Sequence, residues 1–209
     1  MDTNSNQARR VVIGITAHVD AGKTILAEAM LYRTGQLRKL GRVDHGSAAM
    51  DSHLLERERG ITIFSSQAEL PIGDLEVTLL DTPGHVDFSA EMERTLSVLD
   101  YAILVISGAD GVQAHTRTLW RLLELYRIPT FLFVTKMDFG RCGRGQMMEH
   151  LHHELGEGCV DFTPADRERR MEQLATCRED ALEAYLDGGE VPDALGRQVV
   201  GGGAGCSLF

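Results

Sequence analysis

Short apolar runs alternate with amphipathic stretches from the beginning of the chain to residue 138. The apolar runs are rich in Val, Ile, Leu and Phe and predict five strands, at residues 11–16, 61–65, 77–80, 102–107 and 130–135. Helical periodicity predicts three helices between them, at residues 23–33, 89–99 and 116–127. Strands with little polar alternation are typical of a sheet covered on both faces, and their alternation with helices implies parallel crossovers. The pattern therefore predicts an α/β fold with a mainly parallel sheet and helices on both faces.

The connection between the second and third predicted strands is too short for a crossover helix. It covers residues 67–76 and contains Pro71 and Gly73, both of which favour turns. A hairpin is the better interpretation, because antiparallel strands can be joined by a short turn. We therefore expect one antiparallel edge strand on the sheet.

The pattern changes after residue 138. A stretch rich in Gly and Arg leads into a predicted helix and then a weak strand, at residues 140–145, 146–155 and 159–162. One long, charged helix is predicted over residues 165–186, because Pro164 stands where a helix can begin.

The last residues resemble the beginning of a further strand. They are residues 206–209, and they follow a run of glycines at residues 201–203. We therefore expect the chain to be the N-terminal piece of a longer protein. The expected organisation is a polar tail at residues 1–9 and an incomplete domain over residues 10–209, which includes a charged helical segment at about residues 145–200.

The composition is that of an ordinary globular protein. The 209 residues are 43% hydrophobic and 25% charged, and no apolar run approaches the ~20 residues of a membrane span. The net charge of −10 opposes binding to phosphate backbones. The four cysteines form no C-x-x-C pair, which favours reduced thiols over a zinc or disulfide framework. We expect a cytoplasmic monomer without membrane or sequence-specific DNA partners.

Three histidines lie close together on the helix predicted over residues 146–155. They are His150, His152 and His153, and their spacing does not match the H-E-x-x-H motif of zinc enzymes. We expect them to lie on a solvated helix face.

The first predicted strand runs into a loop with the sequence of a phosphate-binding loop, and a helix follows it. The residues are Ala17, His18, Val19, Asp20, Ala21, Gly22, Lys23 and Thr24. The backbone N–H groups of such a loop and of the helix N-terminus converge on an anion. Gly22 permits close approach of the backbone, Lys23 reaches the terminal phosphates, and the Thr24 hydroxyl can bind Mg²⁺. Because Ala17 stands where the strict pattern has Gly, an ordinary glycine turn stays the alternative.

The third predicted strand ends in a motif that fits a metal ion and a γ-phosphate. Its residues are Asp81, Thr82, Pro83, Gly84 and His85. A carboxylate at the end of a parallel strand lies on the edge where open α/β sheets bind ligands, so Asp81 can hold Mg²⁺. Gly84 can turn its N–H toward a γ-phosphate, and Thr62 can offer a hydroxyl to Mg²⁺ at the second strand. A plain turn and an ordinary strand-entry threonine are the alternatives.

The fifth predicted strand ends in a motif that fits guanine. Its residues are Thr135, Lys136, Met137 and Asp138. The Asp138 carboxylate can accept hydrogen bonds from guanine N1–H and from the exocyclic amine, which adenine does not offer there. The aliphatic stem of Lys136 can pack over the purine. Together, in order and at strand ends, the motifs are a far stronger signal than any one of them, and they predict a P-loop NTPase-type fold that binds GTP or GDP with Mg²⁺.

These motifs make the chain resemble the translational GTPases of the elongation factor G class. Residues 40–46, 54–63 and 97–100 resemble the ribosomal protection proteins of tetracycline resistance most closely. The resemblance implies GTP hydrolysis with the ribosome as partner. It also implies that His85 positions the attacking water, that Lys23 acts on the phosphates, and that Asp20 helps to hold the histidine or a cation. Residues 44–62 would form a switch that the γ-phosphate orders.

Two of the chain's departures from the family pattern concern the guanine site. Thr135 stands where the family usually has Asn, so we expect the loss of an amide that ties the guanine loop to the phosphate loop, and weaker guanine binding. A Ser-Ala-Lys-like loop that backs the guanine in the family would follow Phe209. Two alternative functions therefore stay open: the nucleotide domain of an elongation factor G-like translocase, and a truncated nucleotide-binding module without turnover.

Overall fold

The structure is a computed structural model that describes residues 9–37, 66–81, 94–139, 142–162, 167–192 and 207–208. The chain divides into two compact units, one of residues 1–15 and 24–100 and the other of residues 16–23 and 101–209. The boundary crosses the first strand before Thr16. The predicted phosphate loop up to Lys23 therefore groups with the second unit.

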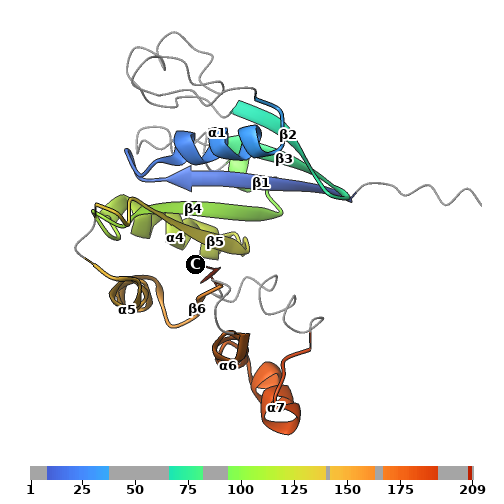
Figure 1. Cartoon of the computed structure of the whole chain (residues 1–209), viewed down its shortest axis with the longest axis vertical. Helices are drawn as coiled ribbons and strands as arrows, with labels where there is room; N and C mark the ends of the chain where they lie inside the picture. The colour runs from blue at the N-terminus through green and yellow to red at the C-terminus, as the bar shows by residue number, and fades with distance from the viewer. Residues whose placement is uncertain are drawn as a thin grey trace, which may run out of the picture. The chain divides into compact units, whose positions relative to one another are not determined.

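The first unit contains three strands and a helix, which are β1 (Arg9–Ala17), α1 (Lys23–Arg33), β2 (Ser66–Ile72) and β3 (Leu75–Asp81). Strand β3 lies between the other two (Figure 1). It pairs in parallel with β1, from Arg9 opposite Leu75 to Ile15 opposite Asp81, and antiparallel with β2. The predicted first strand and first helix are confirmed, and the helix has the predicted bounds.

Strands β2 and β3 form the predicted hairpin, but the first strand of the hairpin was predicted in the wrong place. It covers Ser66–Ile72, where the sequence suggested a connection, and residues 61–65 lie outside the described residues. The turn is only Gly73 and Asp74, and Gly73 has a φ of 62° that favours glycine. Leu70 is buried while Glu69 is exposed, so β2 lacks the continuous apolar run on which the prediction relied.

The helix predicted over residues 89–99 ends earlier than expected. Residues 89–93 lie outside the described residues, Arg94–Leu96 are helical, and a turn follows them. Leu99 instead packs against Gly14, where an added Cβ would lie 2.3 Å from Leu99 Cδ1. Asp100 then bonds to β1, because its N–H donates to Val12 O at 2.9 Å and its carboxylate accepts the Val12 N–H at 2.8 Å.

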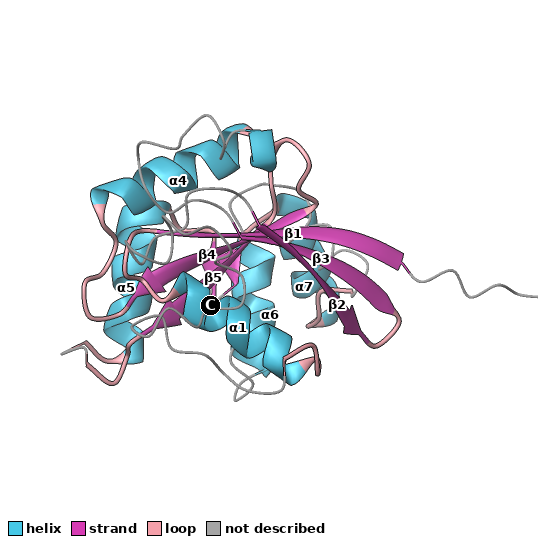
Figure 2. Cartoon of the chain, turned by 90° about the horizontal axis from the view of Figure 1, so that it is seen from above, coloured by secondary structure: helices cyan, strands magenta, loops and turns pink. Residues whose placement is uncertain are grey.

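The second unit is built on four strands in the order β4-β5-β7-β6, all parallel. They are β4 (Tyr101–Ser107), β5 (Thr130–Thr135), β6 (Cys159–Val160) and β7 (Ser207–Leu208). Helix α4 (Ala114–Leu125) packs on β4 (Figure 2). Helix α5 (Arg144–Leu155) packs on β6. The strand expected at the end of the chain is confirmed, since Ser207 and Leu208 pair with β6 and Leu208 with Phe131 of β5.

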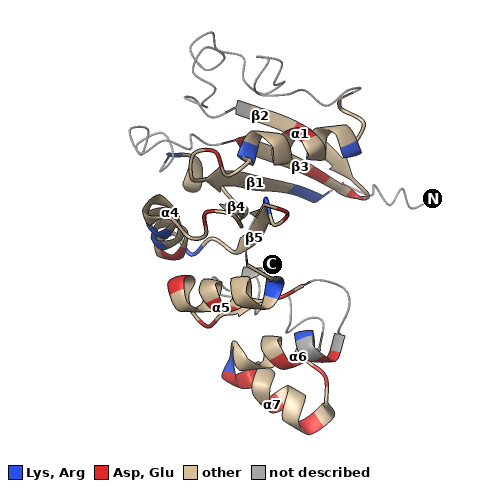
Figure 3. Ribbon diagram, turned by 60° about the vertical axis from the view of Figure 1, so that its left-hand side comes forward, with Lys and Arg blue, Asp and Glu red and all other residues tan. Residues whose placement is uncertain are grey.

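The long helix predicted over residues 165–186 is wrong, because this segment forms two helices. They are α6 (Arg167–Thr176) and α7 (Glu179–Gly188), which lie side by side in Figure 1. Arg178 between them is extended, with φ −151° and ψ 146°, and its guanidinium pairs with Asp180. The reversal buries apolar side chains of both helices in one cluster, formed by Val160, Leu174, Ala175, Ala181 and Val191. The charged residues of α7 are all acidic (Figure 3).

The predicted fold class is confirmed. The pairs β1–β3, β4–β5, β5–β7 and β6–β7 are parallel, β2–β3 is antiparallel, and helices pack on the strands. Within the described ranges, no helix is long and apolar enough to cross a membrane.

Candidate functional site

The predicted phosphate loop forms a tight turn between β1 and α1. The Ala21 N–H donates to His18 O at 3.2 Å, and Asp20 and Gly22 have positive φ angles of 61° and 92°. Helix α1 begins at Lys23, whose side chain is 8% exposed. A loop of this form presents backbone N–H groups together with a helix N-terminus, which is the arrangement that binds phosphate.

Two side chains of the predicted guanine motif hold the backbone of this loop. Thr135 Oγ1 donates to Ala21 O at 2.6 Å, and Lys136 Nζ donates to Asp20 O at 2.7 Å. The two loops are therefore still tied although the amide is absent, and the expected weaker guanine binding stays a prediction. The side chain of Thr135 is short, but its hydroxyl reaches the carbonyl because the phosphate loop lies close to it. A Cβ added at Gly22 would be only 3.6 Å from Thr135 Cγ2.

The rest of the guanine motif turns toward solvent. Lys136 has a φ of 53° and its carbonyl accepts the Phe139 N–H at 3.2 Å, so the chain reverses directly after β5. Met137 is half-buried, whereas Asp138 and Phe139 are exposed. The Asp138 carboxylate is thus accessible to a ligand.

A turn that the motifs did not single out packs against the guanine motif. Its residues 108–111 follow β4 directly, and the Gly108 N–H donates to Thr135 O at 2.7 Å. A Cβ added at Gly108 would lie 2.5 Å from Met137 Sδ. The available signal was the pair of glycines, Gly108 and Gly111, at the carboxyl end of a buried strand.

Two buried polar atoms at the phosphate loop have no hydrogen-bond partner among the described residues. They are Thr16 Oγ1 and His18 Nδ1. Buried polar atoms are normally hydrogen-bonded, so their environment fits a polar ligand at this loop. The His18 ring also lies against the ring of His115 at the start of α4, with 5.9 Å between ring centroids. Sequence reasoning did not select His115, because nothing in its local pattern marks it.

The predicted metal ligands that the structure describes lie in the first unit. Asp81 is the last residue of β3, pairs with Ile15 of β1 and is fully buried. Thr24 is the second residue of α1 and is half-buried. A carboxylate and a hydroxyl are oxygen donors that suit Mg²⁺. Thr62, Thr82, Pro83, Gly84 and His85 lie outside the described residues. In the described part, no group of three or more His, Cys, Asp or Glu side chains could hold a metal ion.

Two histidines of α5 are not on a solvated face, so that expectation is wrong for them. His150 Nε2 accepts the Val112 N–H at 3.2 Å, and His152 Nε2 lies 2.8 Å from Cys159 O. Both are half-buried because α5 packs on α4 and on β6. His153 is exposed as expected.

Comparisons with known proteins agree on one family. Residues 8–191 match the family model described as the elongation factor Tu GTP binding domain. The oxytetracycline resistance protein of Streptomyces rimosus is 55% identical, and the tetracycline resistance protein TetO of Campylobacter jejuni is 50% identical. Each match covers 84% of this chain and 29% of the relative, so the chain spans less than a third of the length of these curated relatives.

A solved structure supports the same fold. A crystal structure of a protein from Thermus thermophilus matches with a TM-score of 0.82 and 25% sequence identity. The match covers 96% of this chain and 37% of that chain.

Proposed function

This chain belongs to the family of elongation factor Tu GTP-binding domains, and on that premise we propose that it binds and hydrolyses GTP as the nucleotide domain of a ribosome-dependent translation factor. We further propose that this factor is of the ribosomal-protection type. The resemblance to tetracycline resistance proteins is confirmed by relatives at 50–55% identity, and the resistance that their names print supports this proposal over that of a translocase.

One observation carries the proposal most strongly. The loop that begins α1 and the loop that follows β5 are joined by two hydrogen bonds, from Thr135 and Lys136 to consecutive carbonyls of the phosphate loop. A phosphate site and a base site joined in this way can hold the two ends of one nucleotide at a fixed separation. Fixed placement matters because phosphoryl transfer is accelerated mainly by positioning and charge neutralisation.

The residues of the phosphate loop divide the work of binding a triphosphate. The N–H groups of residues 17–24 would surround the phosphate oxygens, with Gly22 giving the backbone its left-handed turn. Lys23 would neutralise charge on the terminal phosphates, where its burial strengthens the interaction. Asp138, with the stem of Lys136 beside it, would select guanine.

A magnesium ion fits the oxygen donors of the first unit. Thr24 and Asp81 would hold it, together with the predicted ligand Thr62. When bound, the ion neutralises charge on the phosphate oxygens. His85 would orient the attacking water, with Asp20 helping to hold that histidine or a cation, and Gly84 would donate its N–H to the γ-phosphate.

Competition binding tests the proposal on this chain. A fluorescent GDP analogue with Mg²⁺ should give a saturable signal that GTP and GDP displace, while ATP should compete more weakly by several orders of magnitude, on the order of 10⁴-fold. Lys23→Ala should abolish binding, whereas Arg33→Ala, an exposed cation at the other end of α1, should leave binding unchanged.

Two results would contradict the proposal. A missing signal in the folded wild-type chain would exclude a nucleotide site, and equal competition by ATP would exclude the guanine assignment. Binding without phosphate release, even when a longer protein is supplied with ribosomes, would instead favour a nucleotide-binding module without turnover.

A further inference from the structure

The turn at residues 108–111 is held between the guanine motif and helix α5. At one end, the Gly108 N–H donates to Thr135 O at 2.7 Å. At the other end, the Val112 N–H donates to His150 Nε2 at 3.2 Å. Both glycines are in close contact, because a Cβ at Gly108 would lie 2.5 Å from Met137 Sδ and one at Gly111 would lie 2.9 Å from His150 Nε2.

Internal hydrogen bonds stiffen this turn. The Gly111 N–H donates to Ser107 O at 2.8 Å, and Ser107 Oγ donates to Asp110 Oδ2 at 2.6 Å. Gln113 Nε2 donates to Asp110 O at 2.6 Å and links the turn to the start of α4. The turn is therefore a compact, internally hydrogen-bonded connection between β4 and α4.

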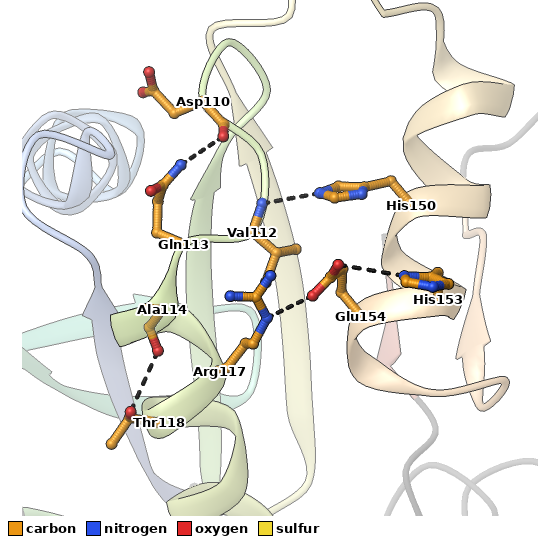
Figure 4. Close-up of polar contacts among 9 residues, drawn as sticks. All are labelled: Asp110, Val112, Gln113, Ala114, Arg117, Thr118, His150, His153 and Glu154. Atoms are coloured by element: carbon orange, nitrogen blue, oxygen red, sulfur yellow. Dashed lines mark hydrogen bonds and ion pairs between the residues drawn. The ribbon is translucent and has the colours of Figure 1, made fainter.

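Helix α5 is also fastened to α4 beside the turn. Arg117 of α4 pairs with Glu154 of α5 at 2.5 Å, one helical turn beyond His150 (Figure 4). In the same view His150 points at the Val112 N–H, whereas His153 lies on the far side of Glu154. His150 is thus the α5 side chain that contacts the turn, while Glu154 contacts α4.

We propose that His150 is a positioning residue for the nucleotide site, which it influences through the turn at residues 108–111 and the guanine motif. This inference rests on the proposed function. The backbone carbonyl of Thr135 accepts a hydrogen bond from the Gly108 N–H, and the side-chain hydroxyl of Thr135 donates one to Ala21 O. A continuous chain of contacts therefore runs from α5 to the phosphate loop.

The proposal requires an uncharged imidazole. Nε2 accepts the Val112 N–H only when it carries no proton. Protonation of His150 removes this acceptor and places the Nε2–H donor opposite the Val112 N–H donor. By linkage, conditions that protonate His150 then weaken nucleotide binding. Besides Asp110 in the turn, the charged or titratable groups on these two helices are His115, Arg117, Arg121 and Glu124 of α4 and Arg144, Glu149, His152, His153 and Glu154 of α5.

Two substitutions at this position separate the acceptor from the ring. His150→Gln places an amide oxygen near the position of Nε2, so it keeps an acceptor that does not titrate. His150→Leu replaces the imidazole by an apolar side chain of comparable size and leaves the Val112 N–H without an acceptor. His153→Gln is the matched control, because His153 is 82% exposed and lies on the same helix.

The measurement is the dissociation constant of this chain for GDP and for inosine diphosphate, from about pH 7.5 to about pH 5.5, where histidines ordinarily titrate. His150→Leu should weaken GDP binding about fivefold or more at pH 7.5, in the lower range of coupling between sites. Inosine diphosphate lacks the exocyclic amine, so its affinity should fall less than that of GDP if the guanine motif has shifted. A general loss of stability would weaken both nucleotides equally.

The pH profile provides the second readout. Wild type and His153→Gln should lose GDP affinity together on acidification, and His150→Gln should lose less. The comparison between variants is needed because two further histidines, His18 and His115, lie at the phosphate loop with their rings against each other. The readout does not depend on His150→Leu, which could fail to fold.

Identical pH profiles for wild type and His150→Gln would overturn the proposal. Wild-type affinity in a folded His150→Leu would also overturn it, as would an equal loss for both nucleotides. In all three cases the wild-type chain still binds GDP, so the proposed function survives. If the wild-type chain binds no GDP, both the proposed function and the role of His150 are wrong.

Discussion

The hydroxyl of Thr135 joins structural elements that are far apart in the sequence. Besides its bond to Ala21 O at 2.6 Å, it lies 3.3 Å from Ile106 O at the end of β4. An amide at this position would bridge the loops with a longer side chain. Threonine can make the bridge because the phosphate loop approaches β5 closely at Gly22.

Replacing Thr135 by valine tests this bridge. Valine has nearly the same shape but no hydroxyl, so Thr135→Val leaves the Ala21 carbonyl without its donor. A hydrogen bond of this kind contributes about 1 kcal/mol, so GDP affinity should fall about fivefold. Fluorescence titration of the GDP analogue measures the change.

Serine at the same position is the control. Thr135→Ser keeps the hydroxyl and should bind GDP within about twofold of wild type. Equal affinity of Thr135→Val and wild type would show that the bridge is not used in binding.

At the scale of elements, α4 and α5 are joined by a partly shielded ion pair. Arg117 donates to Glu154, whose side chain is 16% exposed. The hydrogen bond from Arg117 lowers the pKa of Glu154 below its usual value of 4.5 and raises the pKa of Arg117. The pair therefore stays ionised at neutral pH and in mild acid.

Glu154→Gln should change the acid stability of the protein. Because the pKa of Glu154 is lower in the folded state than in the unfolded chain, the pair stabilises the fold above the unfolded value. That contribution is lost as the pH falls through 4.5 toward the folded value. Wild type should thus be more stable than Glu154→Gln at about pH 6, and the difference should shrink by about pH 3.

Urea unfolding at the two pH values measures this difference. The sign of the change is the decisive point, since a difference that grows in acid would contradict the lowered pKa. Glu149→Gln, an exposed carboxylate on the same helix, should show no such convergence with wild type.

The elements that were predicted well are those with a strong local signal. Residues 23–33 and 130–135 have the predicted bounds, because one begins after a phosphate loop and the other is a continuous apolar run. The strand Ser66–Ile72 and the break at Arg178 were missed because partners distant in the sequence determine them. Ser66–Ile72 depends on pairing with β3, and the break at Arg178 depends on the cluster around Leu174 and Ala181.

The candidate site shows the same limit. Lys23, Thr135, Lys136 and Asp138 were identified from motifs, which are local in sequence. His150 was not, because its contact with Val112 spans 38 residues and arises from the packing of α5 on α4. No pattern within a single helix could indicate that contact.

At the scale of the whole molecule, hydrolysis should depend on more than this chain. The chain covers 29% of the relatives that it matches, and the proposed ribosome partner would act on a longer protein. We predict that His85→Ala in such a protein leaves GTP affinity nearly unchanged and lowers ribosome-stimulated phosphate release by roughly 10²-fold or more. Single-turnover phosphate release with and without ribosomes measures this effect, and unaltered release would remove His85 from the mechanism.

Nucleotide binding should also stabilise the fold of this chain as a whole. A ligand that binds only the folded state adds about 2.7 kcal/mol at a concentration of one hundred times its dissociation constant. For a domain of this size, 1 kcal/mol raises the melting temperature by about 2–4 °C. GDP with Mg²⁺ should therefore raise the melting temperature by roughly 5–11 °C, while ADP at the same concentration should have almost no effect.

Lys23→Ala should remove the increase without lowering the melting temperature of the ligand-free chain to the same extent, because its proposed role is to bind phosphate. An equal increase with ADP would mean that the protein recognises the phosphates but not the base, and Asp138 would then lose its proposed role.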